Sequence, residues 1–165
     1  MGFIFPRHKI LFYLKQKTFW LEFFFFGLIL FIFLINSNHE TYPDEFDNIL
    51  GGRYLLQGKL FYRDWFSHHG PFSYVVSAVV NIFSGTSFVN FRFFYSLLLS
   101  LFTIGTFIFL RRRLSDISLS FYLFFIFFLA LSSTYFWGHM LLADNLSAFL
   151  LLPVFALIFL KTVYR

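Results

Sequence analysis

Long apolar runs separated by short basic clusters are the feature of this sequence that most restricts its fold. Hydrophobic residues make up 59% of the 165 positions, 31 of them are Phe, and only 13% are charged. An ordinary soluble domain has roughly 25% charged residues. One core of a chain this size cannot bury so much apolar surface, whereas a lipid bilayer accommodates it. The sequence therefore predicts an all-α integral membrane protein.

The basic residues decide how many of these runs cross the membrane. Runs over 19–36, 88–110, 118–137 and 145–160 are predicted transmembrane helices, and the basic segment 1–18 is expected at the cytoplasmic face. The run 71–85 is also apolar, but it has about 15 residues where about 20 are needed. If it does not cross, the basic clusters at 7–17, 111–113 and 161–165 all lie in the cytoplasm, as the positive-inside rule requires. We therefore predict four spans, with both termini cytoplasmic.

This topology leaves residues 37–87 as one large external loop, in which we expect two interfacial helices, over about 44–57 and 71–85. Pro43 followed by two acids is a typical helix start, and Gly58 is a typical end. The glycine pair 51–52 is expected to break or weaken the first helix. Polar residues recur on one face of the second helix, which predicts that it lies in the interface. These polar residues are Ser73, Ser77, Asn81 and Ser84.

Composition also excludes several kinds of function. The chain has no cysteine, which rules out disulfides, thiolate catalysis and cysteine metal sites. Its net charge of +5 comes from clusters beside apolar runs, so we expect a membrane and no nucleic-acid partner. Ionisable residues at membrane depth are costly and indicate a functional site. Under the predicted topology, Asp44 and Asp144 lie at the same external face.

An ordered set of short motifs runs through the loop and its flanking spans. It consists of Tyr42-Pro43-Asp44-Glu45, the glycines of 51–58, Leu60-Phe61-Tyr62-Arg63-Asp64-Trp65, His69-Gly70-Pro71, Phe83-Ser84-Gly85, Phe91-Arg92 and Ala143-Asp144. Together with the topology, this set resembles the N-terminal part of the membrane glycosyltransferases of the C superfamily. That superfamily includes protein O-mannosyltransferases and lipid A aminoarabinose transferases. The resemblance covers about residues 19–160.

The resemblance implies transfer of a hexose or pentose from a polyprenyl-phosphate donor to a lipid, glycan or protein acceptor outside the cytoplasm. A bacterial cytoplasmic membrane is the expected location. Asp44 matches the acid that acts on the acceptor, and a carboxylate can take the proton of an acceptor hydroxyl. The residues assigned to substrate binding are Glu45, Arg53, Arg63, His69, Arg92 and Asp144.

This sequence departs from the pattern of the family at two points, which concern binding of the donor phosphate and binding of a metal. Some relatives have Lys-Pro where this chain has Gly70-Pro71, so the phosphate would have to be held by an arginine or a protonated histidine. Some relatives also bind a divalent metal, but the candidate ligands here have no recognised metal spacing, so we assign neither a metal site nor a cofactor. These candidates are His39, Glu40, His68, His69, His139 and Asp144.

Other interpretations of the same residues stay open. Asp44 and Glu45 also suit an ordinary helix N-terminus, and Arg92 could extend its head group to the interface from the start of a span. Tyr42, Tyr62 and Trp65 suit either a sugar platform or an interfacial aromatic belt. Because the family continues through many more helices, we expect these 165 residues to be an inactive fragment. A non-catalytic membrane scaffold or assembly subunit is the main alternative, and a transporter piece is the next.

Overall fold

The computed structural model describes residue 20, residues 23–35, residue 37, and residues 41–67, 71–111, 113–114, 116–132 and 140–160. Apart from one isolated bridge between Phe61 and Trp65, the regular structure of these residues is helical, which confirms the predicted all-α class. A helix covers Phe23–Ile35. It is followed by α2 (Pro43–Leu56), α3 (Pro71–Ser84), α4 (Phe88–Arg111), α5 (Asp116–Ser132) and α6 (Ala143–Phe155), which continues into the π-helical segment η1 (Ala156–Leu160).

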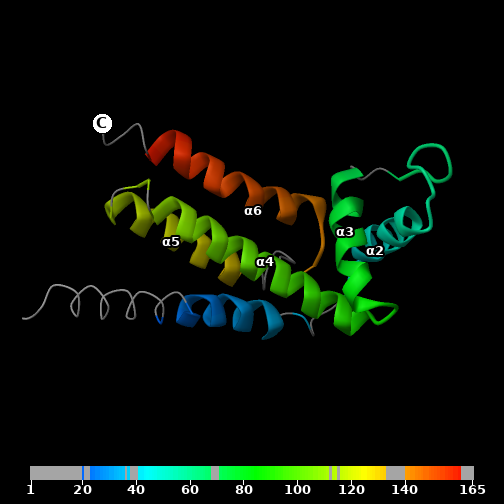
Figure 1. Cartoon of the computed structure of the whole chain (residues 1–165), viewed down its shortest axis with the longest axis horizontal. Helices are drawn as coiled ribbons and strands as arrows, with labels where there is room; N and C mark the ends of the chain where they lie inside the picture. The colour runs from blue at the N-terminus through cyan, green and yellow to red at the C-terminus, as the bar shows by residue number, and fades with distance from the viewer. Residues whose placement is uncertain are drawn as a thin grey trace, which may run out of the picture.

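Four of the helices form an elongated bundle, and the other two cap one of its ends. The helix Phe23–Ile35, α4, α5 and α6 run alongside one another, while α3 runs across the end of the bundle and α2 packs on α3 (Figure 1). Aromatic rings join the bundle helices: Phe33 and Phe149 have ring centroids 5.5 Å apart, as do Phe25 and Phe107. At 14 residues, α3 is shorter than a membrane crossing requires, and the prediction that residues 71–85 do not cross the membrane stays a prediction.

The lengths of the helices support fewer spans than the four predicted. At 24 residues, α4 is about 36 Å long, and it is the one helix in the described residues that is long and apolar enough to cross a membrane. The other apolar helices have 10–17 residues. The expected spans 19–36 and 118–137 extend into residues that the structure does not describe. Within 145–160, Pro153 lies inside α6, where it lacks a backbone donor, and the α-helix ends at Phe155.

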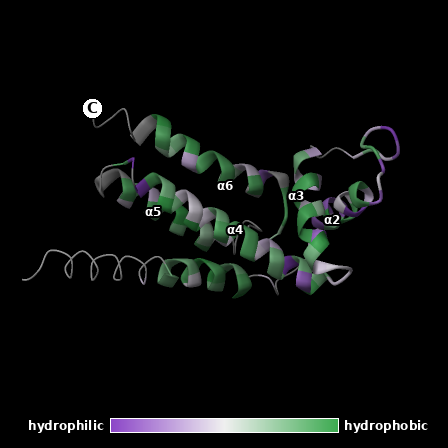
Figure 2. Ribbon diagram, viewed as in Figure 1, coloured by the Kyte–Doolittle hydropathy of each residue, from purple (hydrophilic) through white to green (hydrophobic). Residues whose placement is uncertain are grey.

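The bundle is apolar on its outside and partly polar on its inside. Phe24, Phe124 and Phe155 are each more than half exposed, and hydrophobic residues run along the whole bundle in Figure 2, with hydrophilic residues gathered near α2 and its following loop. In contrast, Ser100 and Thr103 of α4 are buried, and their hydroxyls donate to backbone carbonyls one turn earlier, each at 2.8 Å. The apolar exterior differs from that of a soluble helix bundle, which carries polar residues on its exposed face.

The contact between α2 and α3 corrects two predictions. The glycine pair does not break α2, which is continuous from Pro43 to Leu56. Instead it lets the two helices touch: a Cβ on Gly51 would lie 2.3 Å from the Tyr74 ring, and one on Gly52 would lie 2.4 Å from Ser77 Oγ. The polar stripe of α3 is correspondingly buried beneath α2, where we expected it to face the interface. Close approach of small residues lets Asn81 of this stripe donate from Nδ2 to the Ile49 carbonyl of α2 at 3.1 Å.

Candidate functional site

The N-terminal half of α2 carries three acids that lie in different surroundings. Pro43 occupies the first turn of α2, and Asp44 and Glu45 follow it at the positive end of the helix dipole. Asp47 follows two positions after Glu45 in the same helix. α2 ends as predicted, because Gly58 has φ +76° and donates its backbone N–H to the Leu55 carbonyl at 3.0 Å.

Glu45 and Arg92, both predicted to bind substrate, form a buried ion pair with each other. Arg92 donates from Nε to Glu45 Oε1 at 3.0 Å and from Nη2 to Oε2 at 2.7 Å. The Glu45 side chain is fully buried and that of Arg92 is 3% exposed. Arg92 also donates to the Ser37 carbonyl and lies 4.6 Å from the Phe88 ring centroid. This bidentate ion pair, together with the bond to Ser37, joins α2, α4 and the segment before α2. Its role is therefore structural.

Burial and ion pairing act in opposite directions on the Glu45 carboxyl. Removal from water raises the pKa of Glu45 above its ordinary value, because burial penalises the charged form. The hydrogen bonds and the positive charge of Arg92 oppose this rise. The carboxyl therefore depends on Arg92 to stay ionised in its buried position. Breaking the pair would leave one charge buried without compensation.

Asp47 was absent from the predicted site, yet it organises the outer loop. Its Oδ2 accepts hydrogen bonds from Ser67 Oγ at 2.6 Å and from the Tyr74 hydroxyl at 2.9 Å. Burial is the main cause that raises the pKa of Tyr74, to about 12. The partners lie 20 and 27 positions away from Asp47, so no local pattern in the sequence could have revealed them.

The two other predicted arginines also have partners in the structure. Arg53 donates from Nε to Asn81 Oδ1 at 3.3 Å and from Nη2 to the Thr86 carbonyl at 3.1 Å. Arg63 is exposed and forms a two-pronged pair with its neighbour Asp64, at 2.9 and 2.8 Å. Hydrogen bonds from Arg63 and from the Leu60 backbone lower the pKa of Asp64 to about 2. Arg53 is therefore the one of the three predicted arginines whose recorded partners are uncharged.

The two acids singled out from the sequence lie at the same end of the bundle. Asp44 is half-buried in the first turn of α2, and its carbonyl accepts a hydrogen bond from Asn48 Nδ2 at 2.8 Å. Asp144 is exposed in the first turn of α6, and Figure 1 shows that α6 begins beside α3. That this end of the bundle is the external membrane face stays a prediction.

Several candidate residues lie outside the described part of the chain: His69 of the predicted substrate site, and four of the other metal-ligand candidates, namely His39, Glu40, His68 and His139. Among the residues that are described, no three His, Asp or Glu side chains come together as a metal site.

The predicted aromatic residues of the loop differ from one another in exposure. Trp65 packs between Tyr54, Phe61 and Tyr74, with ring centroids 5.3–6.0 Å away, and is half-buried. Tyr62 is 65% exposed and has φ +65°, a backbone conformation that is strained for a bulky residue. Tyr42 is also exposed, just before α2. Tyr62 and Tyr42 are therefore more accessible to a ligand than Trp65.

Taken together, the described residues form a helical bundle that α2 and α3 cap at one end, and one of their helices is long and apolar enough to cross a membrane. Comparison with protein-family models, with curated proteins and with solved structures finds no match for the chain.

Proposed function

We propose that the bundle is embedded in a membrane through all four of its helices, with α2 and α3 on the external side. Support comes from the outward-facing Phe side chains and the inward-facing hydroxyls, which suit a hydrocarbon solvent. The position of the basic clusters supports cytoplasmic termini. The composition and short loops suggest a bacterial cytoplasmic membrane.

We further propose that the chain belongs to a glycosyltransferase that moves a sugar from a polyprenyl-phosphate donor to an external acceptor. The observation that carries this proposal is the position of Asp44 in a helix that is anchored by a buried ion pair, at the end of the bundle that we assign to the external side. Glu45 is the next residue along the chain, so its bonds to Arg92 hold the first turn of α2 in place. A catalytic carboxylate needs such a fixed position.

In the proposed step, Asp44 takes the proton of the acceptor hydroxyl as its oxygen attacks the anomeric carbon of the sugar. The bond between that carbon and the phosphate oxygen breaks, and the lipid phosphate leaves with the electron pair. The sugar carbon is inverted, so one base is enough. Arg92 and Arg63 already neutralise Glu45 and Asp64, so the candidate cations for the donor phosphate are Arg53, Lys59 and a protonated His69.

The test is an Asp44→Asn substitution in the chromosomal copy of the natural host, which keeps the chain in its own context. Transfer of labelled sugar from the lipid-phosphate donor in isolated membranes should fall by roughly 10²–10⁴-fold. Asp64→Asn removes a carboxylate of the same loop and should keep most of the activity. Protein abundance is compared by immunoblot. Asp44→Asn membranes that retain full transfer would rule out the assigned base.

The alternative is a non-catalytic scaffold or assembly subunit, and the exposed loop favours it as the second candidate. Tyr62 is 65% exposed and Phe66 is 79% exposed, and large exposed aromatic groups are common at protein interfaces. A scaffold would tolerate Asp44→Asn but would lose its assembly role when Tyr62 and Phe66 are both replaced by Ser.

A further inference from the structure

Three buried polar groups near the Glu45–Arg92 ion pair have no hydrogen-bond partner among the residues that the structure describes. They are the side-chain carbonyl of Asn48 on α2 and the hydroxyls of Tyr95 and Ser96 on α4. Asn48 and Tyr95 are fully buried, and Ser96 is 1% exposed. A buried polar group without a partner costs free energy, and a bound water or ion can supply the missing hydrogen bond. These groups therefore indicate a site for a small ligand.

The three groups belong to the helical turn that follows the ion pair on each helix. Asn48 comes three positions after Glu45 on α2. Tyr95 and Ser96 come three and four positions after Arg92 on α4. Residues at this spacing lie on one face of a helix, and their side chains lean toward its N-terminus, which here means toward the ion pair. Tyr95 also lies within electrostatic range of the Glu45 carboxyl, so the unpartnered groups surround one buried contact.

Neighbouring polar groups show what these three do not have. Ser100 and Thr103, further along α4, each donate to the carbonyl four positions earlier, at 2.8 Å. Such a bond satisfies a hydroxyl within its own helix. Ser96, in the described part of the same helix, makes no such bond. The Nδ2 of Asn48 donates to the Asp44 carbonyl at 2.8 Å, while its Oδ1 has no donor from the described residues.

The chemistry of these groups selects a neutral ligand that both donates and accepts hydrogen bonds. Glu45 and Arg92 already neutralise each other, so they leave no net charge to attract an ion. The Asn48 Oδ1 only accepts, whereas the hydroxyls of Tyr95 and Ser96 both donate and accept. Side chains that are at most 1% exposed require an occupant small enough to be enclosed. Water meets all three conditions.

We propose that one ordered water molecule binds between α2 and α4 beside the Glu45–Arg92 ion pair. The water donates to Asn48 Oδ1 and accepts from the Tyr95 hydroxyl, and the Ser96 hydroxyl is its third partner. Three hydrogen bonds are typical of a buried water. The water adds a second link between the two helices, one turn beyond the ion pair. This link does not depend on the proposed transfer reaction.

The experiment is X-ray hydroxyl-radical footprinting of the full 165-residue chain in detergent. Radicals formed from a bound water oxidise the side chain beside it, even when that side chain is shielded from solvent. Tyr95 should be oxidised roughly fivefold faster than Tyr122, because a buried water stays beside its partners. Tyr122 is the matched control, since it is 1% exposed and its hydroxyl is bonded to Thr106 Oγ1 at 2.6 Å. Mass spectrometry of proteolytic peptides measures both rates.

Ser96→Ala provides a second test that does not rely on a disruptive change. The Ser96 hydroxyl has no partner among the described residues, so its removal breaks no bond to them. It removes one partner of the water, and oxidation of Tyr95 should fall roughly threefold. Ser100→Ala is the matched control and should leave the rate at Tyr95 unchanged, because Ser100 is bonded to a carbonyl of its own helix. Equal oxidation of Tyr95 and Tyr122 in the wild type, or equal oxidation of Tyr95 in the two serine variants, would overturn the proposal.

Discussion

The pair Glu45–Arg92 shows how one buried contact can decide the position of a whole helix. The Glu45 carboxylate is fully buried and the Arg92 side chain is 3% exposed, so both charged groups have lost most of their hydration. Each charge is therefore stabilised mainly by the other. Because the pair lies directly beside Asp44, the same contact that stabilises α2 also orients the candidate base. A residue predicted to touch substrate can therefore matter for transfer without touching it.

We expect Arg92→Met to lower the free energy of unfolding by about 3–5 kcal/mol, because it leaves the Glu45 carboxylate buried without a cation. The double substitution Glu45→Leu with Arg92→Met should cost much less than the sum of the two single changes. Chemical unfolding of the chain in detergent, followed by circular dichroism, measures both values. The exposed ion pair between Arg63 and Asp64 serves as the control. The free energy of unfolding of Asp64→Asn should be close to that of the wild type. If the double substitution cost as much as the sum of the two single substitutions, the proposed coupling would be contradicted.

At the scale of elements, α2 and α3 form a unit because glycine removes two side chains from their contact. A Cβ on Gly52 would approach Ser77 Oγ to 2.4 Å and the backbone nitrogen of Ala78 to 2.7 Å. A backbone atom cannot move aside as a flexible side chain can. The glycine pair therefore permits the close crossing of α2 and α3 that buries the polar stripe of α3.

We expect Gly52→Ala to destabilise the chain by about 1–3 kcal/mol through overpacking, even though alanine is the better helix former. Gly105→Ala is the matched control, because this helical glycine of α4 has nothing within 4 Å of an added Cβ. That variant should be neutral, or more stable by up to about 1 kcal/mol. Thermal unfolding of Gly52→Ala and Gly105→Ala under the same detergent conditions measures both effects. Equal stability of the two variants would contradict the close contact at Gly52.

The positions of the helices were predictable because apolar periodicity, proline and glycine are local features. The expected helices 44–57, 71–85 and 88–110 correspond to α2, α3 and α4 within two residues at each end. The partners of Glu45, Asp47 and Arg53 were not predictable, since they lie 20 to 47 positions away. Helical spacing showed that Ser77 and Asn81 share a face, but not that α2 covers it. The roles of Asp44 and Asp144 stay predictions.

At the scale of the whole molecule, the direction of α3 determines which side of the membrane each loop occupies. If α3 lies in the interface, the loop containing Tyr62 is external, and the turn after α4, which contains Arg113, is cytoplasmic. If α3 crosses instead, both segments lie on the external side. The crosswise position of α3 in Figure 1 favours the first arrangement, and so does the basic cluster that includes Arg113.

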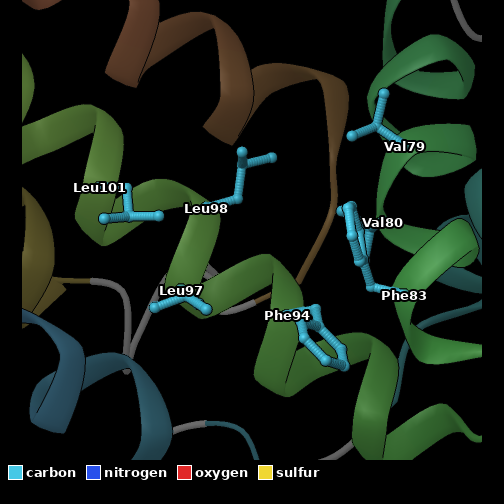
Figure 3. A pocket seen from close by; sticks show the side chains of 7 residues that line it. All are labelled: Val79, Val80, Phe83, Phe94, Leu97, Leu98 and Leu101. Atoms are coloured by element: carbon cyan, nitrogen blue, oxygen red, sulfur yellow. The ribbon is translucent and has the colours of Figure 1, made fainter.

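Single cysteines distinguish these two topologies, because the chain has no cysteine of its own. Tyr62 and Arg113 are both exposed, so a thiol at either position can react. In intact spheroplasts, a membrane-impermeant maleimide should label Tyr62→Cys and leave Arg113→Cys unlabelled until the membrane is permeabilised. Val79 lines an apolar cavity between α3 and α4 (Figure 3). Val79→Cys should therefore react slowly in both states, because the thiolate that attacks maleimide is disfavoured in an apolar environment. Labelling of both Tyr62→Cys and Arg113→Cys in intact spheroplasts would mean that α3 crosses the membrane. Asp44 and Asp144 would then lie on opposite sides of it, and the proposed transfer site could not form.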